Sequence, residues 1–276
     1  MKKVIYNLCV NGFMRPVAKP MHSFLIETTL VYESIIDYWY QKPQDDYFIE
    51  ENVTAVIKTF ERPKVLKRLI LSLRKMYPKM NVIIADDSKN PSYFEGIQTI
   101  ALPYDSGVSF GRNEALKHVQ TPFILLLDDD FIFYRHTKIE PVLKKLKHLH
   151  MIDIIGGEVI YLPFYRKIDY TNAGLHPTNA TSVIPPGTEI EGMKSYDKVA
   201  NFYIAKTDSI RKVAWDPSIK RLDHADFFTR AKGVLTTLFD PAFKVLHART
   251  PFDKDYMSKR MDIAKDKLRL REKFYL

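Results

Sequence analysis

The chain has 276 residues, of which 46% are hydrophobic and 27% are charged, a balance typical of a folded globular protein rather than a disordered one. Its single cysteine, Cys9, excludes a disulfide framework and a zinc site built on several thiolates. The formal net charge of +9 favours anionic partners such as phosphorylated substrates, nucleic acid or a membrane surface. Because the sequence shows neither a signal peptide nor the run of about 20 apolar residues that a spanning helix needs, we expect a cytoplasmic protein.

The first 52 residues are rich in aromatic side chains and lack a clean hydrophobic period. A regular pattern begins only at Val53, so the two parts differ in kind. We interpret residues 1–52 as an N-terminal extension that wraps or covers the main domain, with a helix over Glu27–Tyr40.

From Val53 to residue 150, apolar strands alternate with amphipathic helices. Val53–Thr59 is rich in β-branched residues, as in a buried strand, and Pro63 stands near the start of an amphipathic helix over Lys64–Met76. This alternation predicts a parallel sheet with crossover helices on both faces. The further elements expected are strands at Val82–Ala85, Thr99–Leu102 and Phe123–Leu127, a loop at Gly107–Arg112 and a helix at Asn113–Val119.

The second half, residues 151–250, is less regular, and Tyr165–Ser195 reads as a loop-rich stretch. Residues 254–276 carry eight basic and four acidic side chains. We expect them to form one charged helix that docks on a membrane surface or on the acceptor, at about 1 kcal/mol per basic residue near an anionic leaflet. The other elements expected are helices at Glu140–Leu149 and from Asp223 to Arg230, and strands at Ile152–Leu162, Val199–Ala205 and Leu235–Leu246.

Carboxylates follow three of the predicted strands, at the edge where ligands bind in an open parallel sheet. They are Glu61 after the first strand, Asp86 and Asp87 after the second, and Asp128, Asp129 and Asp130 after the fourth. Such a cluster needs a cation or strongly shifted pKa values, although acids in turns are also commonly just solvated. An Asp-x-Asp after a strand suits Mg²⁺ or Mn²⁺ that bridges to phosphate oxygens, and Arg112 would hold the same phosphates.

Two common nucleotide-binding signatures are missing from the sequence. There is no G-x-x-x-x-G-K-[ST] loop, and Gly107-x-x-x-Gly111 is not a G-x-G-x-x-G fingerprint. NTP hydrolysis on a Walker loop and dinucleotide redox chemistry are therefore both disfavoured.

The successive motifs resemble those of GT-A fold glycosyltransferases of the family 2 type. They are Lys58-Thr-Phe-Glu-Arg-Pro63, Ile84-Ala-Asp-Asp-Ser88, Gly107-x-x-x-Gly-Arg-Asn113 and Leu127-Asp-Asp-Asp-Phe131. Longer stretches, such as FGRNEAL, VANFYIAKTDSIRKVAWDPSIKR and HADFF, are similar to the beta-1,4-N-acetylgalactosaminyltransferase group. The resemblance covers roughly residues 53–250. It implies an α/β GT-A fold with a mostly parallel central sheet, a nucleotide-binding half over 53–150 and an acceptor or catalytic half over 151–250. The N-terminal extension and the basic C-terminal helix, residues 251–276, lie outside the resemblance.

The resemblance also implies a role for each matched position. Asp226 would be the catalytic base, with Asp223 as the second choice, and Asp130 and His247 would bind a Mn²⁺ or Mg²⁺ ion. The nucleotide-sugar would contact Thr59, Glu61, Arg62, Asp86, Asp87, Gly107, Arg112, Asn113, Asp128 and Asp129.

The activity implied is an inverting, metal-dependent transfer of GalNAc or GlcNAc from a UDP-sugar to a glycan or lipid-linked glycan hydroxyl. We expect a role in bacterial surface polysaccharide synthesis, with peripheral contact at the inner face of the plasma membrane. A sugar nucleotidyltransferase is the alternative enzyme, although the loop after the first strand lacks the Gly-rich basic sequence that it needs. A non-catalytic, basic nucleic-acid-binding protein is the alternative from another class; its basic residues would be expected to cluster, whereas here they are spread along the chain.

Overall fold

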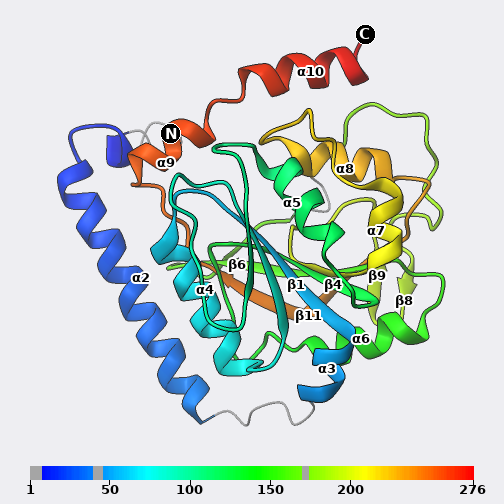
Figure 1. Ribbon diagram of the computed structural model, residues 1–276, viewed down its shortest axis with the longest axis horizontal. Helices are drawn as coiled ribbons and strands as arrows, with labels where there is room; N and C mark the ends of the chain where they lie inside the picture. The colour runs from blue at the N-terminus through cyan, green and yellow to red at the C-terminus, as the bar shows by residue number, and fades with distance from the viewer. Residues whose placement is uncertain (1–7, 40–45, 170–173) are drawn as a thin grey trace.

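The computed structural model describes residues 8–39, 46–169 and 174–276. Parts of the predicted N-terminal extension, residues 1–7 and 40–45, lie outside the described residues. A mixed sheet forms the centre, and helices cover both of its faces (Figure 1). Within the described ranges, no helix has both the length and the hydropathy required to cross a bilayer.

The strands join in the order β3-β2-β1-β4-β10-β6-β11-β9-β8, with β5 paired to β11 and β7 to β6. Their bounds are β1 Val53–Thr59, β2 Asn81–Asp86, β3 Gln98–Ala101, β4 Phe123–Asp128, β5 Phe131–Ile132, β6 Ile154–Tyr161, β7 Arg166–Lys167, β8 Glu189–Ile190, β9 Met193–Ser195, β10 Tyr203–Lys206 and β11 Thr237–His247. The helices are α2 Arg15–Tyr38, α3 Asp46–Asn52, α4 Pro63–Met76, α5 Val108–Lys117, α6 Ile139–His148, α7 Thr207–Val213, α8 Asp223–Ala231, α9 Lys254–Arg260 and α10 Ala264–Phe274.

The predicted parallel sheet occupies the first half of the chain. Strand β1 pairs in parallel with β2 on one side and with β4 on the other, and β2 pairs in parallel with β3. The strand order therefore reverses beside β1, which is the arrangement that opens a ligand crevice at the carboxyl ends of the strands. In the second half, β10 runs antiparallel to β4 and β6, so the complete sheet is mixed.

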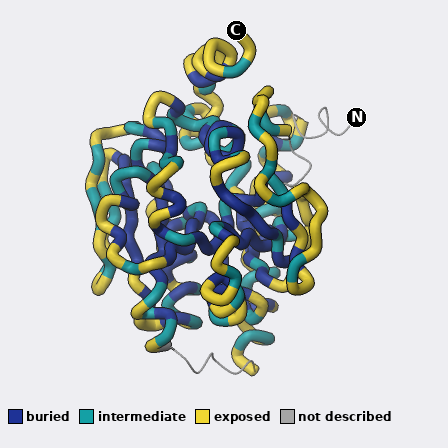
Figure 2. Tube along the Cα trace, turned by 90° about the vertical axis from the view of Figure 1, so that its right-hand side faces the viewer, coloured by how far each residue is buried: buried dark blue, intermediate teal, exposed yellow. Residues whose placement is uncertain are grey.

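Two apolar layers enclose the sheet because successive side chains of a strand point to opposite faces. Ala55 and Ile57 of β1 pack with the buried leucines of α4 and α6, whereas Val56 packs with α5, α7 and α8. Every residue of β1 is buried, as expected of a strand covered on both sides. Figure 2 shows this buried interior and, at one end of the molecule, the largely exposed helix α10.

The N-terminal helix α2 is longer than predicted and lies along the outside of the domain (Figure 1). Ile26 packs into a small apolar cluster with residues of β5, β6 and β11. Glu33 is buried and pairs with Arg135, which also contacts Asp37 at 3.4 Å. The helix therefore wraps the domain and does not cover the pocket described below, whose lining contains none of its residues.

Two sequence predictions about helices are wrong. Residues Val108–Arg112 are the first turns of α5 and not a loop. A Cβ on Gly111 would lie 2.9 Å from Lys58 Cγ, so this glycine permits the close approach of helix and strand. The C-terminal segment forms two helices, α9 and α10, with a break at residues 261–263.

Candidate active site

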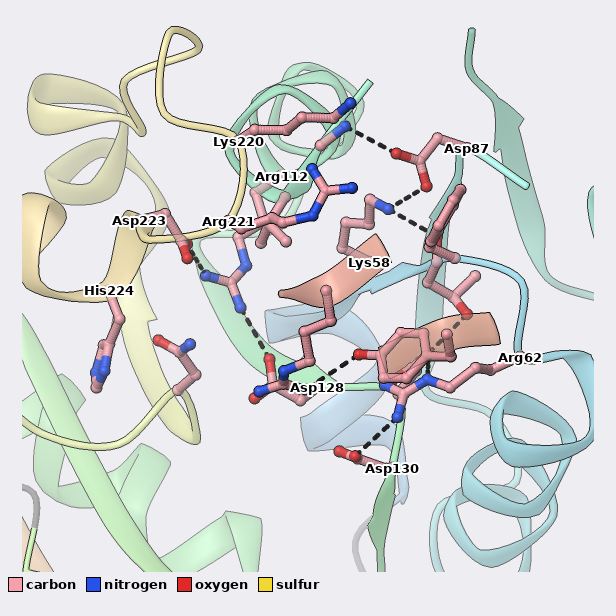
Figure 3. A pocket seen from close by; sticks show the side chains of 18 of the residues that line it. Lys58, Arg62, Asp87, Arg112, Asp128, Asp130, Lys220, Arg221, Asp223 and His224 are labelled. Carbon is pink, nitrogen blue, oxygen red and sulfur yellow. Dashed lines mark hydrogen bonds and ion pairs between the residues drawn. The ribbon is translucent and has the colours of Figure 1, made fainter. Parts of the chain in front are cut away.

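A cavity of about 450 Å³ opens at the carboxyl ends of β1 and β4, a volume suited to a small-molecule ligand. Side chains from both halves of the chain converge on it (Figure 3). Tyr256 and Arg260 of α9 also line it. Its lining includes ten of the predicted site residues: Thr59, Arg62, Asp87, Gly107, Arg112, Asp128, Asp129, Asp130, Asp223 and His247.

Arg62 neutralises two of the three acids that follow β4. Its guanidinium forms an ion pair with Asp129 and lies 3.1 Å from a carboxylate oxygen of Asp130. The hydroxyl of Thr59 donates a 2.8 Å hydrogen bond to Asp129. Asp129 is thus fully engaged within the protein, and burial, which outweighs Arg62, raises its pKa.

Two further buried cations compensate the remaining acids. Lys58 pairs with Asp87, which also accepts a 2.8 Å hydrogen bond from the backbone N–H of Gly107. Arg112 pairs with Asp223 and, at 2.9 Å, with Asp128, so its side chain links the two halves of the pocket. In this structure the Arg112 guanidinium contacts two carboxylates, and its contact with phosphate stays a prediction. The acid cluster therefore obtains its counter-charge from the protein and is not by itself evidence for a metal.

Asp130 and His247 form the pair that fits a metal ion. Strand β11 ends at His247, and its pairing with β5 brings His247 Nε2 to 2.9 Å from a carboxylate oxygen of Asp130. Burial would raise the pKa of Asp130, but His247 and Arg62 together hold it well below its usual range. The Nδ1 atom of His247 is buried without a hydrogen-bond partner among the described residues.

This donor set suits Mn²⁺ or Mg²⁺ in part. One carboxylate and one imidazole are acceptable ligands, and a diphosphate and water would have to complete the shell. Within the described ranges, no group of three acidic, histidine or cysteine side chains gathers as a ready metal cage. A metal here would therefore depend on a bound nucleotide for the rest of its coordination.

The two candidate bases on α8 lie in different surroundings. Asp223 begins the helix and lines the pocket, and burial raises its pKa against the opposing charge of Arg112. Asp226 does not line the pocket; its carboxylate is 1% exposed and contacts Arg230 at 2.9 Å and Lys273 at 2.6 Å. An acid held between two cations away from the cavity is poorly placed to accept a proton from a ligand. The geometry of this structure therefore favours Asp223 over Asp226 as the candidate base.

Three other predicted residues serve the local backbone instead of the pocket. Asp86 accepts hydrogen bonds from the backbone N–H groups of Ser88 and Ser92, at 2.9 and 2.8 Å. Glu61 accepts from the backbone N–H of Lys89 at 2.7 Å. Asn113 exchanges two hydrogen bonds, of 2.7 and 2.9 Å, with the backbone of Trp215. Acids and amides after strands often cap turns in this way, which the sequence pattern alone does not separate from ligand binding.

Several lining residues come from segments that the sequence analysis did not assign to the site. Lys220 and Arg221, in the loop before α8, both contact Asp105, at 2.6 and 2.8 Å. His224 lines the pocket as well, and burial lowers its pKa to about 3, so its ring is neutral at physiological pH. A histidine next to the Asp223 helix start was visible in the sequence, but no spacing marked it as functional.

Helix α9 also reaches the pocket. The Arg62 guanidinium carbon lies 3.9 Å from the centre of the Tyr256 ring, and Arg260 donates a 3.0 Å hydrogen bond to the Tyr256 hydroxyl. Of the cations that line the pocket, Arg249 and Arg260 are those for which the described residues offer no carboxylate within 4 Å. They are the positive charges that remain available for an anionic ligand.

Comparison with known proteins agrees with this architecture. Residues 54–206 match the model of the family described as Glycosyl transferase family 2, which is more than half of the chain. The chain belongs to glycosyltransferase family 2. Among its relatives, Beta-1,4 N-acetylgalactosaminyltransferase 2 of Mus musculus is 35% identical over 216 residues, covering 76% of this chain and 42% of that protein. Beta-1,4 N-acetylgalactosaminyltransferase 1 of Homo sapiens is 34% identical over 200 residues, covering 68% and 37%.

Solved structures show the same GT-A fold for this family 2 chain. S. aureus TarS has a TM-score of 0.54 at 17% identity, covering 75% of this chain and 38% of that one. GalNAc-T7, solved with UDP, GalNAc and Mn²⁺, has a TM-score of 0.53 at 13% identity, covering 81% and 54%. The family 2 chain spans about two fifths of the length of the curated relatives that it matches.

Proposed function

We propose that this chain is an inverting glycosyltransferase that moves an N-acetylhexosamine, GalNAc or GlcNAc, from a UDP-sugar to a glycan hydroxyl. The main support for the proposal is the composition of the pocket. The Asp130–His247 pair, the arginines Arg249 and Arg260 and the buried carboxylate of Asp223 all line the same cavity. Relatives named N-acetylgalactosaminyltransferases at 33–35% identity support the choice of donor sugar.

The donor would lie across the carboxyl ends of β1 and β4. Lys58 and Asp87 stand at the β2 side, where a carboxylate that accepts hydrogen bonds suits the imide N–H of uracil. The diphosphate would lie near Asp130 and His247, where Arg249 and Arg260 are the lining cations for which the described residues offer no carboxylate within 4 Å. Asp130 and His247 would hold a Mn²⁺ or Mg²⁺ ion, whose chemistry is to stabilise the negative charge of the leaving diphosphate.

The reaction is a single displacement. The oxygen of the acceptor hydroxyl forms a bond to the anomeric carbon while the bond from that carbon to the UDP oxygen breaks. The hydroxyl proton passes to the carboxylate of Asp223, and UDP leaves with the bonding electron pair. Asp223 lies across the pocket from Asp130 (Figure 3), so the acceptor and the leaving group would stand on opposite sides of the sugar, as inversion requires.

Burial and Arg112 act in opposite directions on this carboxylate. Burial disfavours the charged form and makes Asp223 a stronger base than an ordinary aspartate, which suits a proton acceptor. Arg112 favours the ionised form of the group and holds it in place through its second contact, to Asp128. The bacterial polysaccharide acceptor and the cytoplasmic, membrane-peripheral location expected from the sequence stay predictions.

A donor screen tests the proposed function. UDP-GalNAc, UDP-GlcNAc, UDP-galactose and UDP-glucose would be incubated with the protein, Mn²⁺ and a panel of glycans, and UDP release would be measured. We expect release above background with at least one N-acetylhexosamine donor, and thermal stabilisation by UDP that needs Mn²⁺. Pyrophosphate release from UTP and a sugar phosphate, without UDP release from any donor, would instead identify a nucleotidyltransferase.

A further inference from the structure

A buried carboxylate outside the pocket holds the loop that leads into α8. Asp266, in the first turn of α10, is 3% exposed. Its two oxygens accept hydrogen bonds from three successive backbone N–H groups, those of Lys220 at 3.0 Å, Arg221 at 2.6 Å and Leu222 at 3.0 Å. Leu222 is the N-cap residue of α8, and its side chain provides no cap. Asp266, from another helix, therefore accepts the hydrogen bonds of the backbone N–H groups that precede α8.

The same loop carries pocket residues and is fixed from its other side. Lys220 and Arg221 line the cavity, and the next residue but one is Asp223, at the start of α8. The carbonyl of Lys220 accepts a 2.7 Å hydrogen bond from the backbone N–H of Val108, the first residue of α5. A Cβ on Gly107 would lie 3.0 Å from the Lys220 Cα, so the loop and α5 are in close contact. Asp266 thus completes a clamp on residues 220–222, with α5 on one side and α10 on the other.

Helix α10 contacts α8 and the segment before it at a second point. Near its C-terminal end, Lys273 Nζ lies 2.6 Å from both Asp226 of α8 and Asp216. Between the two contacts, the side chain of Leu270 is buried. The helix is therefore attached at both ends to the loop and helix that carry Asp223, while most of its outer surface is exposed (Figure 2).

We propose that Asp266 is a positioning residue, which acts through the backbone of residues 220–222 to place the Asp223 carboxylate in the pocket. The inference rests on the proposed function, in which Asp223 accepts the proton. Displacing a reacting group by about 1 Å can cost on the order of 10²-fold in rate, so a loosened loop would reduce turnover without removing any group that touches the donor. The basic C-terminal helix is in this view a part of the enzyme's framework.

The test uses the full chain with the isosteric change Asp266→Asn. The amide keeps the size of the carboxylate but turns an NH₂ group, itself a donor, toward backbone donors. We expect faster hydrogen exchange at the amides of residues 220–222 and a fall in kcat of about tenfold or more. The dissociation constant of UDP should change by less than about threefold, because Lys58 and Arg260 are untouched. Asp262→Asn, an exposed aspartate just before α10, is the matched control and should change none of these.

A second variant that restores the carboxylate distinguishes a positioning role of Asp266 from a role in packing alone. Asp266→Glu should recover part of kcat and of the amide protection, since a carboxylate again faces the donors. A lower melting temperature of Asp266→Asn with unchanged kcat and exchange would overturn the inference and leave a purely structural role. An equal loss of UDP affinity and kcat would also overturn it, because the donor site would then have collapsed. If the wild-type protein releases no UDP from any donor, the proposed function fails, and the exchange at the three amides still decides whether Asp266 holds this loop.

Discussion

Replacing Asp223 by Asn should separate the proposed proton acceptor from its neighbour one turn along α8. A general base contributes about 10²–10⁴-fold to the rate, which is about 3–5 kcal/mol at 1.36 kcal/mol per decade. The amide cannot accept the proton, so we expect kcat to fall by that factor. Removing one charge from the buried Arg112–Asp223 pair should also lower the free energy of unfolding. Part of the interaction remains, because Asn still accepts a hydrogen bond from Arg112 and Arg112 keeps its contact with Asp128. The dissociation constant of UDP should stay nearly unchanged.

The matched variant Asp226→Asn should lose stability but keep nearly all of its turnover. Its carboxylate is buried between Arg230 and Lys273, so losing the charge should cost about 1–3 kcal/mol of unfolding free energy. At roughly 2–4 °C per kcal/mol, the melting temperature should fall by several degrees. Below that temperature kcat should stay within a few-fold of the wild-type value, because Asp226 does not line the pocket.

Steady-state UDP release at 20 °C and thermal melts of both variants decide the question. The reasoning is refuted if Asp226→Asn loses turnover by 10²-fold or more while Asp223→Asn remains active. The sequence resemblance would then have named the base correctly, and α8 would have to rotate when the ligands bind. Loss of UDP binding in Asp223→Asn would indicate instead that Arg112 had also lost its contact with Asp128.

The other predictions concern the anionic ligand, the metal and pH. Arg260→Ala should weaken UDP binding by about 10–150-fold, the equivalent of 1.5–3 kcal/mol for a charged contact, but leave uridine binding unchanged. Calorimetry measures both affinities, with Lys267→Ala, at an exposed position on α10, as the control. An equal loss of affinity for UDP and for uridine would contradict a phosphate contact. EDTA should abolish turnover and Mn²⁺ restore it, and Asp130→Ala should lose most activity; near-normal rates in that variant at low metal would disprove the assignment. At saturating Mn²⁺, kcat/KM should fall as pH is lowered, with a midpoint above the ordinary aspartate value of about 4, because the base must be ionised and burial raises the Asp223 pKa. The assay is a pH–rate profile. If kcat/KM falls at low pH in Asp223→Asn as it does in the wild type, protonation of Asp223 is not the cause of the fall.

The sequence by itself determined the first half of the fold. Buried parallel strands are continuous apolar runs because both of their faces are covered, and the predicted bounds of Val53–Thr59 agree with β1 to the residue. The rule that ligands bind at the carboxyl ends of such strands predicts a site at Asp87 and Asp128–Asp130, and these residues line the pocket. These inferences succeed because they depend on local periodicity and on chain order.

The tertiary structure alone decided which acids line the pocket. Asp223 and Asp226 are three residues apart in one motif, and only the packing of α10 against α8 shows that Lys273 engages the second of them. The partners of the acid cluster were likewise invisible, since Arg62 and Arg112 are 67 and 111 residues from the acids they contact most closely. The charge of the C-terminal segment predicts a docking helix, which stays a prediction; the structure shows in addition that the segment supplies Arg260 to the pocket and Asp266 to the loop before α8. A charge pattern records how many ionic groups a segment carries, whereas their partners are set by long-range contacts that form only when the chain has folded.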